Sequence, residues 1–448
     1  MIKTMTLKRT LLGLLFSIFF IGVISAQEVE SILITNANIF DGKSDALIKN
    51  QSVLIEGNII KQIGASNKVP KGAMVIDAKG ATLSPGFMDI HAHLALNTGP
   101  ADMFYAPADY HSALSLYQAE KTLMMGFTTI RDVGGSVFGV KRAIDEGYFK
   151  GPRIYASGPP ISMTAGHGDY RSPLTLPRQL GGSSHSELEV TGVTTFADGV
   201  PEVLSAARMH MRSGAAFIKM FVGGAVSGMY DPLDIVEYSY EEVKAAADEA
   251  DRWNTYLAVH TYTDKATQIA IKAGAKTLEH CNLITEETVK MAVENDCYIS
   301  AQTGVYLAEA PSSFTSAQKA RQQQAADGLD NLLSLCKKHN AKVAFGSDLL
   351  MDMEVKKTLC EEFTNRTKWF TNAEILKQAT SINGGILALS GPRNPYPGKI
   401  GVIEEGALAD ILLIDGNPLE NIEILTNPEK NLLLIMKDGK VYKNIINK

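Results

Sequence analysis

The chain has 448 residues, of which 45% are hydrophobic and 21% are charged, and its formal net charge is −6. This length and composition fit a folded protein of one large or two smaller domains and exclude a disordered chain. The acidic balance gives no support to nucleic-acid or anionic-membrane binding. The cysteines are too few for a disulfide framework and match no zinc-binding spacing, so we expect buried free thiols at Cys281, Cys297, Cys336 and Cys360.

The first residues have the pattern of a secretory signal peptide. Three basic residues precede an apolar run over residues 11–24, which is followed by Ser25-Ala26. We predict a signal peptide over residues 1–26 with cleavage after Ala26; an uncleaved anchor is the alternative. Cleavage removes three positive charges and takes the formal net charge from −6 to −9. We expect an exported protein, periplasmic or secreted, with no membrane contact after cleavage.

Short strands separated by turns occupy both ends of the mature chain. Turn sequences such as Asp41-Gly42 and Lys79-Gly80 separate apolar runs near the N-terminus. These strands are too few to close a core of their own, and the strand–turn–strand pattern of residues 401–415 supplies more. We therefore expect residues 27–84 and 396–448 to form one composite β-sandwich.

Between these ends, over residues 85–395, short apolar strands alternate with helical stretches. The predicted strands cover residues 86–93, 128–133, 153–157, 217–222, 257–262, 277–282, 298–303 and 343–348. The predicted helices cover residues 111–125, 140–148, 202–212, 240–253, 265–273, 286–294, 318–338 and 372–389. Capping boxes at Ser239 and Thr371 mark the start of two of these helices. Eight strands alternating with eight helices predict an α/β fold of the (β/α)₈ TIM-barrel type, with its active site at the C-terminal ends of the strands.

The first barrel strand ends in the sequence Pro85-Gly86-Phe87-Met88-Asp89-Ile90-His91-Ala92-His93. Because side chains alternate along a strand, His91 and His93 point to the same face. Two adjacent neutral imidazoles can hold one metal ion. The alternative is a pair of surface histidines that share a face by chance.

Other polar residues stand in or at the ends of later barrel strands. These are Lys219, His260, His280 and Asp348. Each has a structural alternative: a hydrogen-bonded histidine, a lysine whose stem is buried, or an aspartate that caps a helix. Their joint placement at one end of the barrel favours a functional site.

With these residues in order, the chain resembles the amidohydrolase superfamily, and the resemblance covers nearly the whole mature chain. The segment Gly401-Val402-Ile403-Glu404-Glu405-Gly406 resembles the superfamily's C-terminal signature. The segments Ala197-Asp198-Gly199, Phe217-Ile218-Lys219-Met220, Leu278-Glu279-His280 and Gly166-His167-Gly168-Asp169 are similar to the metal-dependent Xaa-Pro dipeptidase (prolidase-like carboxypeptidase), imidazolonepropionase-related branch. That branch also includes ochratoxin-hydrolysing amidases.

The resemblance implies a binuclear metal site. His91, His93 and Asp348 would hold the first divalent ion, His260 and His280 the second, and an N6-carboxylated Lys219 would bridge the two. Zinc is the expected metal, although histidine and carboxylate ligands also suit manganese and cobalt. The two ions would share a hydroxide that attacks the scissile carbonyl, and Asp348 would move the proton to the leaving amine.

Two further residues are assigned by the resemblance. His167, in a glycine-rich loop after the third barrel strand, would bind substrate and stabilise the developing oxyanion. Its alternative is a loop histidine with a structural hydrogen bond. Tyr230, in the loop after the fourth strand, would contact substrate, but the sequence around it departs from the family pattern.

The predicted function is that of an exported, metal-dependent amidohydrolase that cleaves a dipeptide or an N-acyl amino acid, as a Xaa-Pro dipeptidase does. The alternatives are a ring hydrolase of the imidazolonepropionase or deaminase kind, a lactonase or esterase on the same scaffold, and a non-catalytic binding protein. The sequence of the long loops after the strands does not identify the substrate. An even-numbered homo-oligomer is common in the family.

Overall fold

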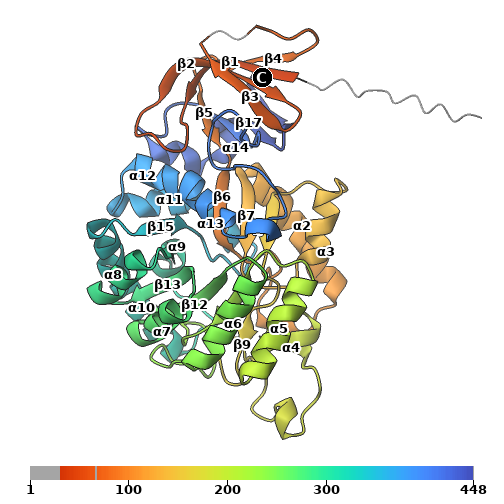
Figure 1. The fold of residues 1–448 in the computed structure, drawn as a ribbon, viewed down its shortest axis with the longest axis vertical. Helices are drawn as coiled ribbons and strands as arrows, with labels where there is room; N and C mark the ends of the chain where they lie inside the picture. Colours follow the sequence, from red (N-terminus) through yellow and green to blue (C-terminus); the bar gives the residue numbers. More distant parts are fainter. Residues whose placement is uncertain (1–30, 66–67, 447–448) are drawn as a thin grey trace, which may run out of the picture.

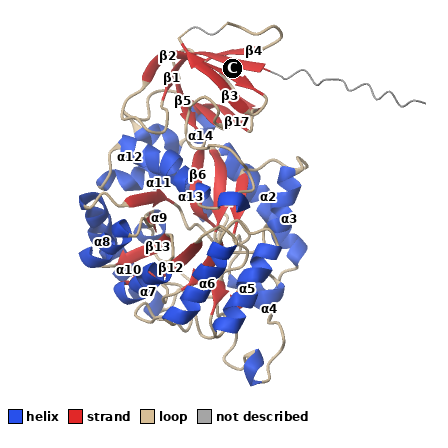
Figure 2. Cartoon of the chain, viewed as in Figure 1, coloured by secondary structure: helices blue, strands red, loops and turns tan. Residues whose placement is uncertain are grey.

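The computed structural model describes residues 31–65 and 68–446. The predicted signal peptide lies outside these described residues. Figure 1 shows a β-sheet region, formed by the two ends of the chain, above a larger body of helices and strands, and Figure 2 shows the same division by secondary structure. In the described part of the chain, none of the helices combines the length and apolar character needed to cross a bilayer.

Both ends of the chain contribute to one eight-stranded sheet. Its strands are β1 Ser31–Ile39, β2 Ile48–Glu56, β3 Ile59–Gly64, β4 Met74–Asp77, β5 Thr82–Pro85, β16 Ile411–Ile414, β17 Leu432–Lys437 and β18 Lys440–Asn444. The order is β18-β17-β16-β5-β1-β2-β3, and β4 pairs with β1. β5 pairs antiparallel with β16 in the register Pro85 to Ile411. Strand pairing therefore joins segments from opposite ends of the sequence.

The larger body contains two parallel sheets. The first is β6 Phe87–Ala92, β7 Phe127–Asp132 and β8 Arg153–Ala156; the second is β9 Ile161–Ser162, β10 Thr195–Phe196, β11 Ile218–Phe221, β12 Leu257–Thr263, β13 Thr277–Leu283, β14 Tyr298–Ala301 and β15 Lys342–Phe345. All eight predicted barrel strands are present within a few residues, whereas the two-residue strands β9 and β10 were not predicted. The α/β class with parallel strands is confirmed.

Two seams separate the parallel sheets, and single backbone hydrogen bonds cross them. At the seam between β8 and β11, the Ala216 amide donates to the Ala156 carbonyl at 2.8 Å. At the seam between β15 and β6, the Asp348 amide donates to the His91 carbonyl at 2.8 Å. The strand ladders themselves do not close a ring. The second seam matters for function because it links two predicted site residues directly.

Helices surround the parallel strands. They are α1 Pro100–Tyr105, α2 Ala108–Met124, α3 Phe138–Asp145, α4 Glu187–Val190, α5 Val200–Arg212, α6 Tyr240–Arg252, α7 Asp264–Ala273, α8 Glu286–Glu294, α9 Gly304–Leu307, α10 Ser316–Lys338, α11 Glu361–Asn365, α12 Asn372–Lys377, α13 Asn383–Ala388 and, beside the terminal sheet, α14 Pro428–Asn431. The capping boxes at Ser239 and Thr371 are formed as predicted. All four cysteines are buried and free, as expected.

The predicted helix over residues 372–389 is not a continuous α-helix. A π-helical turn, Gln378–Ile382, separates α12 from α13. Immediately after this turn, the buried Asn383 amide donates to the carbonyls of Met88 and Phe345 at 2.9 and 2.8 Å. Asn383 therefore joins β6 to β15 where their ladder is absent. A π-turn at such a position is typical of helices that adapt to a local tertiary contact.

Candidate metal centre and active site

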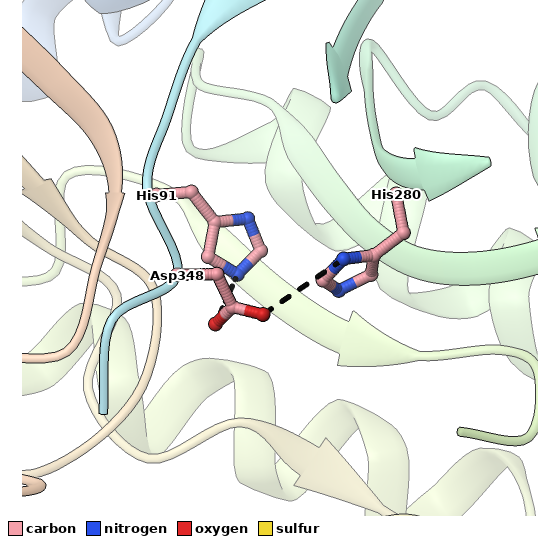
Figure 3. Close-up of side chains that lie close together, drawn as sticks. All are labelled: His91, His280 and Asp348. Carbon is pink, nitrogen blue, oxygen red and sulfur yellow. Dashed lines mark ion pairs between the residues drawn. The ribbon is translucent and has the colours of Figure 1, made fainter. Parts of the chain in front are cut away.

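The predicted ligands come together at the C-terminal ends of the parallel strands. Asp348 lies between several of these ligands: its Oδ1 is 3.1 Å from His93 Nε2 and 3.4 Å from His91 Nε2. Its Oδ2 lies 4.0 Å from His280 Nδ1, and Figure 3 shows His91, His280 and Asp348 converging from different parts of the chain. The ring of His280 also contacts that of His260, and their centroids are 4.5 Å apart. Donor atoms of His91, His280 and Asp348 are close enough to share one ion.

His91 of β6 and His93, which directly follows β6, each form a hydrogen bond through Nδ1, which leaves Nε2 of each ring free. His91 Nδ1 donates to Glu279 Oε2 at 2.8 Å. His93 Nδ1 donates to the Gly134 carbonyl at 3.2 Å. In both rings Nε2 is then the unprotonated nitrogen, and it faces Asp348. This arrangement of an outer acceptor and a free inner nitrogen is typical of metal-binding histidines.

Glu279, which sequence reasoning did not single out, is held by a buried arginine. Arg131 and Glu279 have fully buried side chains, and Arg131 Nη2 donates to Glu279 Oε1 at 2.5 Å. Arg131 Nε also donates to the Ile90 carbonyl at 2.5 Å. Burial raises the pKa of Glu279, but the charge of Arg131 and the bond from His91 outweigh it and hold that pKa well below its usual range. Glu279 is therefore a carboxylate that orients His91.

Two buried nitrogen atoms at the site lack partners. Within the residues the structure describes, neither Lys219 Nζ nor His260 Nε2 has a hydrogen-bond partner. Burial lowers the pKa of the Lys219 amine to about 8. An unpartnered polar group in the interior is costly, so its presence indicates an additional group that would complete the site. Four imidazoles, one carboxylate and one unpaired lysine are a donor set that fits divalent metal ions.

The electrostatic state of the site suits metal binding. Burial lowers the pKa of His91 to about 4 and places that of His280 well below its usual range, so both rings are neutral, which is the ligating form. Burial raises the pKa of Asp348, but the neighbouring His91 and His93 outweigh it and lower that pKa. The side chains of His93 and Asp348 remain 10% and 16% exposed, so the site is open to solvent.

The backbone is unusual at the same place. His280, Cys281 and Asp348 have φ angles of 72°, 61° and 56°. This left-handed region is uncommon for residues other than glycine and costs free energy. Strain of this kind persists where the surrounding structure holds a side chain in a required direction. Here the strained residues His280 and Asp348 have side chains that face each other, with Nδ1 and Oδ2 4.0 Å apart.

A pair of tyrosines supports His280. The Tyr306 hydroxyl lies 3.0 Å from His280 Nδ1 and 2.6 Å from the Tyr262 hydroxyl. The Tyr262 ring stacks on His280 with an interplanar angle of 2°. No local sequence pattern indicates these contacts, because Tyr306 belongs to the short helix α9 in the loop after β14.

The structure brings His167 to the site. Its ring stacks on that of His260, with centroids 4.6 Å apart. Its backbone amide donates to Glu237 Oε1 at 2.8 Å, and the neighbouring Gly168 amide donates to Ser162 Oγ at 2.9 Å. The glycine-rich loop is thus anchored to its surroundings while its imidazole lies beside a predicted ligand.

Tyr230, predicted to contact substrate, lies against the loop that carries His167. Its hydroxyl donates to the Arg171 carbonyl at 2.7 Å, which braces the loop that carries His167. Tyr170, which was not predicted, lies near His167: the two ring centroids are 6.5 Å apart. Burial raises the pKa of Tyr170 to about 12, and the charges of Asp231 and Asp348 add to this effect.

Comparison with known proteins agrees with the geometry. Residues 82–442 match the sequence profile described as the Amidohydrolase family. An ochratoxinase from Aspergillus niger is 29% identical over 443 residues, which cover 94% of this chain and 88% of that protein. A prolidase solved with N-methylphosphonate-L-proline has a TM-score of 0.86 at 30% identity, covering 92% of this chain and 100% of that chain. A Xaa-Pro dipeptidase solved with methionine in its active site has a TM-score of 0.80 at 27% identity, covering 93% and 100%.

The profile spans the parallel-strand body and most of the terminal sheet, and the similar proteins are matched over nearly their whole length. The predicted prolidase-like and ochratoxinase-like resemblance is therefore confirmed. This chain belongs to the amidohydrolase family, and it is a hydrolase that acts on carbon–nitrogen bonds.

Proposed function

We propose that this protein is an exported, binuclear metal-dependent amidohydrolase that releases a C-terminal amino acid from a dipeptide or an N-acyl amino acid. The observation that carries the proposal is the position of Lys219, a buried and unpartnered amine among three histidines. Burial is the main cause that lowers the pKa of His91, His260 and His280, and the charge of Lys219 adds to this effect in all three rings. A ring hydrolase of the one-metal kind has no use for a lysine at this position.

We assign His91, His93 and Asp348 to one divalent ion and His260 and His280 to a second, with an N6-carboxylated Lys219 between them. Zinc is the expected metal. When bound, such ions lower the pKa of water and polarise a carbonyl group. Carboxylation converts a cationic lysine, which cannot ligate, into an anion that can. The unpaired Lys219 Nζ and His260 Nε2 atoms support this assignment.

The protein's own groups would then move the proton and hold the substrate. Asp348 would accept a proton from the attacking water and return it to the leaving amine, which needs a carboxylate that is ionised at neutral pH. The lowered pKa of Asp348 provides this form. His167, stacked beside His260, would contact the scissile carbonyl. Tyr230 is proposed as a substrate contact; its hydroxyl would exchange its present hydrogen bond to the Arg171 carbonyl for one to the substrate.

The substrate class rests on the similar proteins. The prolidase and the Xaa-Pro dipeptidase are named for dipeptides, and one is solved with a phosphonate of L-proline. An ochratoxinase is similar to this chain over 94% of its length. We propose a small-molecule substrate, export to the periplasm or medium, and a homo-oligomeric assembly.

The first test is release of free amino acids by zinc-loaded residues 27–448 in bicarbonate buffer, over a panel of dipeptides and N-acyl amino acids. Asp348→Asn should reduce kcat by about 10²–10⁴-fold, because proton transfer loses its carboxylate. Lys219→Ala should lower both activity and zinc content. If no amino acid is released from any compound while two zinc ions are bound, the proposed substrates change to lactones and esters. Full activity of a fully metallated Lys219→Ala protein would contradict the proposed site.

A further inference from the structure

A buried carboxylate lies beside the Nδ1 edge of the His167 ring. Asp231, in the loop between β11 and α6, is completely buried. Its Oδ2 lies 3.5 Å from His167 Nδ1. A face of the same histidine ring stacks on His260, one of the proposed metal ligands, with centroids 4.6 Å apart. Asp231 therefore approaches the ring edge that carries Nδ1, and because it is buried it is not itself exposed to a substrate.

These facing groups have no other hydrogen bond. In the described chain, His167 Nδ1 and both carboxylate oxygens of Asp231 are buried without a partner. Burying a carboxylate without a hydrogen bond is expensive, so a donor is expected within reach. His167 Nδ1 is the donor-capable atom that lies there. Hydrogen bonds in active sites without substrate are often long and tighten when substrate binds, and 3.5 Å fits that behaviour.

The loop around Asp231 is shaped for this close approach. A Cβ atom on Gly228 would lie 1.6 Å from Asp231 Oδ1, so any larger residue there would displace the carboxylate. Arg321 of α10 fixes the same loop, because its Nη1 donates to the carbonyls of Ala225 and Asp231, each at 2.9 Å. The absence of a side chain at Gly228 thus leaves room for the carboxylate, and Arg321 holds the loop that carries it.

A second buried acid holds the backbone of the same histidine. Glu237 Oε1 accepts from the His167 amide, and a Cβ on Gly166 would lie 2.4 Å from Glu237 Oε2. The loop after β11 therefore contacts His167 twice, at the main chain through Glu237 and at the ring through Asp231. Since β11 also carries Lys219, one strand and its loop place both a predicted ligand and the support for His167.

We propose that Asp231 is a positioning residue that accepts a hydrogen bond from His167 Nδ1 and thereby presents Nε2 to the substrate. Without this contact, the imidazole can rotate about its side-chain bonds and exchange the two nitrogens. The inference rests on the proposed function only for the identity of the substrate. The contact between His167 Nδ1 and Asp231 exists in the protein without substrate.

The kinetic test is a double-mutant cycle on the zinc-loaded protein. Asp231→Ala should lower kcat by about 10–100-fold with KM changed less than about threefold and zinc content unchanged. Asp231→Asn keeps an acceptor oxygen and should restore most of the activity. In a His167→Ala background, Asp231→Ala should have no further effect, because the group it positions is absent.

Asp198→Ala is the matched control. Asp198 holds the loop that carries His167, because its carboxylate accepts hydrogen bonds from the Thr164 amide and hydroxyl at 2.9 and 2.7 Å. Its side chain does not face the His167 ring. Its effect should persist in the His167→Ala background. Additive effects of Asp231→Ala and His167→Ala would overturn the proposal, as would an Asp231→Asn protein as slow as Asp231→Ala.

A substrate-independent measurement separates this proposal from the proposed function. In ¹⁵N-histidine-labelled protein, with the signal assigned by its loss in His167→Gln, His167 should carry a proton on Nδ1. The protonation of Nδ1 should be lost or shifted in Asp231→Ala. An unprotonated Nδ1 in the wild-type protein overturns the inference, whether or not any substrate in the panel is cleaved and whether or not the Asp231 variants fold.

Discussion

At the scale of single residues, the ligating nitrogen of His91 depends on a chain of buried contacts from Arg131 through Glu279. Glu279→Gln would keep the shape of the side chain but remove its charge and weaken the acceptor for His91 Nδ1. We expect zinc affinity to fall by about 10–100-fold. Competition with a chelator of known affinity measures this change.

Glu286→Gln is the control for that substitution. Glu286 also receives bonds from a histidine and a lysine, His339 and Lys338, but it lies on the surface at the start of α8. Its loss should leave zinc affinity unchanged. An unaltered affinity in Glu279→Gln would show that His91 is oriented without its carboxylate partner.

The residues that the sequence could predict are those whose chemistry and strand position coincide. His91, His93, Lys219, His260, His280 and Asp348 all stand at or near strand ends, and the structure brings them together. Glu279 could not be found in this way, because alternation along β13 places it and His280 on opposite faces. The left-handed φ angles of His280 and Cys281 change the direction of His280, and no local sequence signal indicates that change.

At the scale of elements, α5 carries a buried histidine whose protonation opposes folding. His210 Nε2 lies 3.0 Å from Thr195 Oγ1 of β10, and burial lowers the pKa of His210 to about 4. The unfolded value is 6.5, so protons bind the unfolded state more tightly. This contribution to stability is complete above pH 6.5 and is lost as the pH falls toward 4.

Urea unfolding at two pH values tests the contribution of His210. Between pH 7.5 and 5.0, His210 should reduce the free energy of unfolding by about 2 kcal/mol. His210→Gln should remove this part of the pH dependence, whereas His185→Gln, in an exposed loop, should not. An identical pH dependence in the wild-type and His210→Gln proteins would contradict the assignment.

Most elements were predictable because their patterns are long. The eight strands and the capped helices each have an apolar run or a capping box of several residues. β9 and β10 have two residues each, too few for a periodic pattern, and they form because the loop after β8 folds back on β11. The π-turn before Asn383 likewise depends on contacts with β6 and β15, which are distant in sequence.

At the scale of the whole molecule, one buried ion pair connects the two parts of the fold. Arg153 of β8 binds Asp410, beside β16, through Nε at 2.9 Å, and their side chains are 6% and 3% exposed. Arg153 also binds the half-exposed Asp438 through Nη2 at 2.7 Å. Asp410→Ala therefore removes only the buried partner of the arginine, and we expect a loss of about 1.5–3 kcal/mol in the free energy of unfolding. Chemical denaturation measures the loss. Glu146→Ala breaks the exposed pair with Arg142 and should cost less than about 1 kcal/mol; equal losses in both variants would refute this account.

The pairing of β5 with β16 also constrains how the protein is made. More than three hundred residues separate Pro85 from its partner Ile411, so a ribosome adding about 5–20 residues per second needs roughly 15–60 s to supply the second strand. During that interval, one edge of β5 has no strand beside it. An unpaired edge is a template for aggregation. We therefore expect the newly made N-terminal strands to need a chaperone, or to remain unfolded, until the segment that forms β16 emerges.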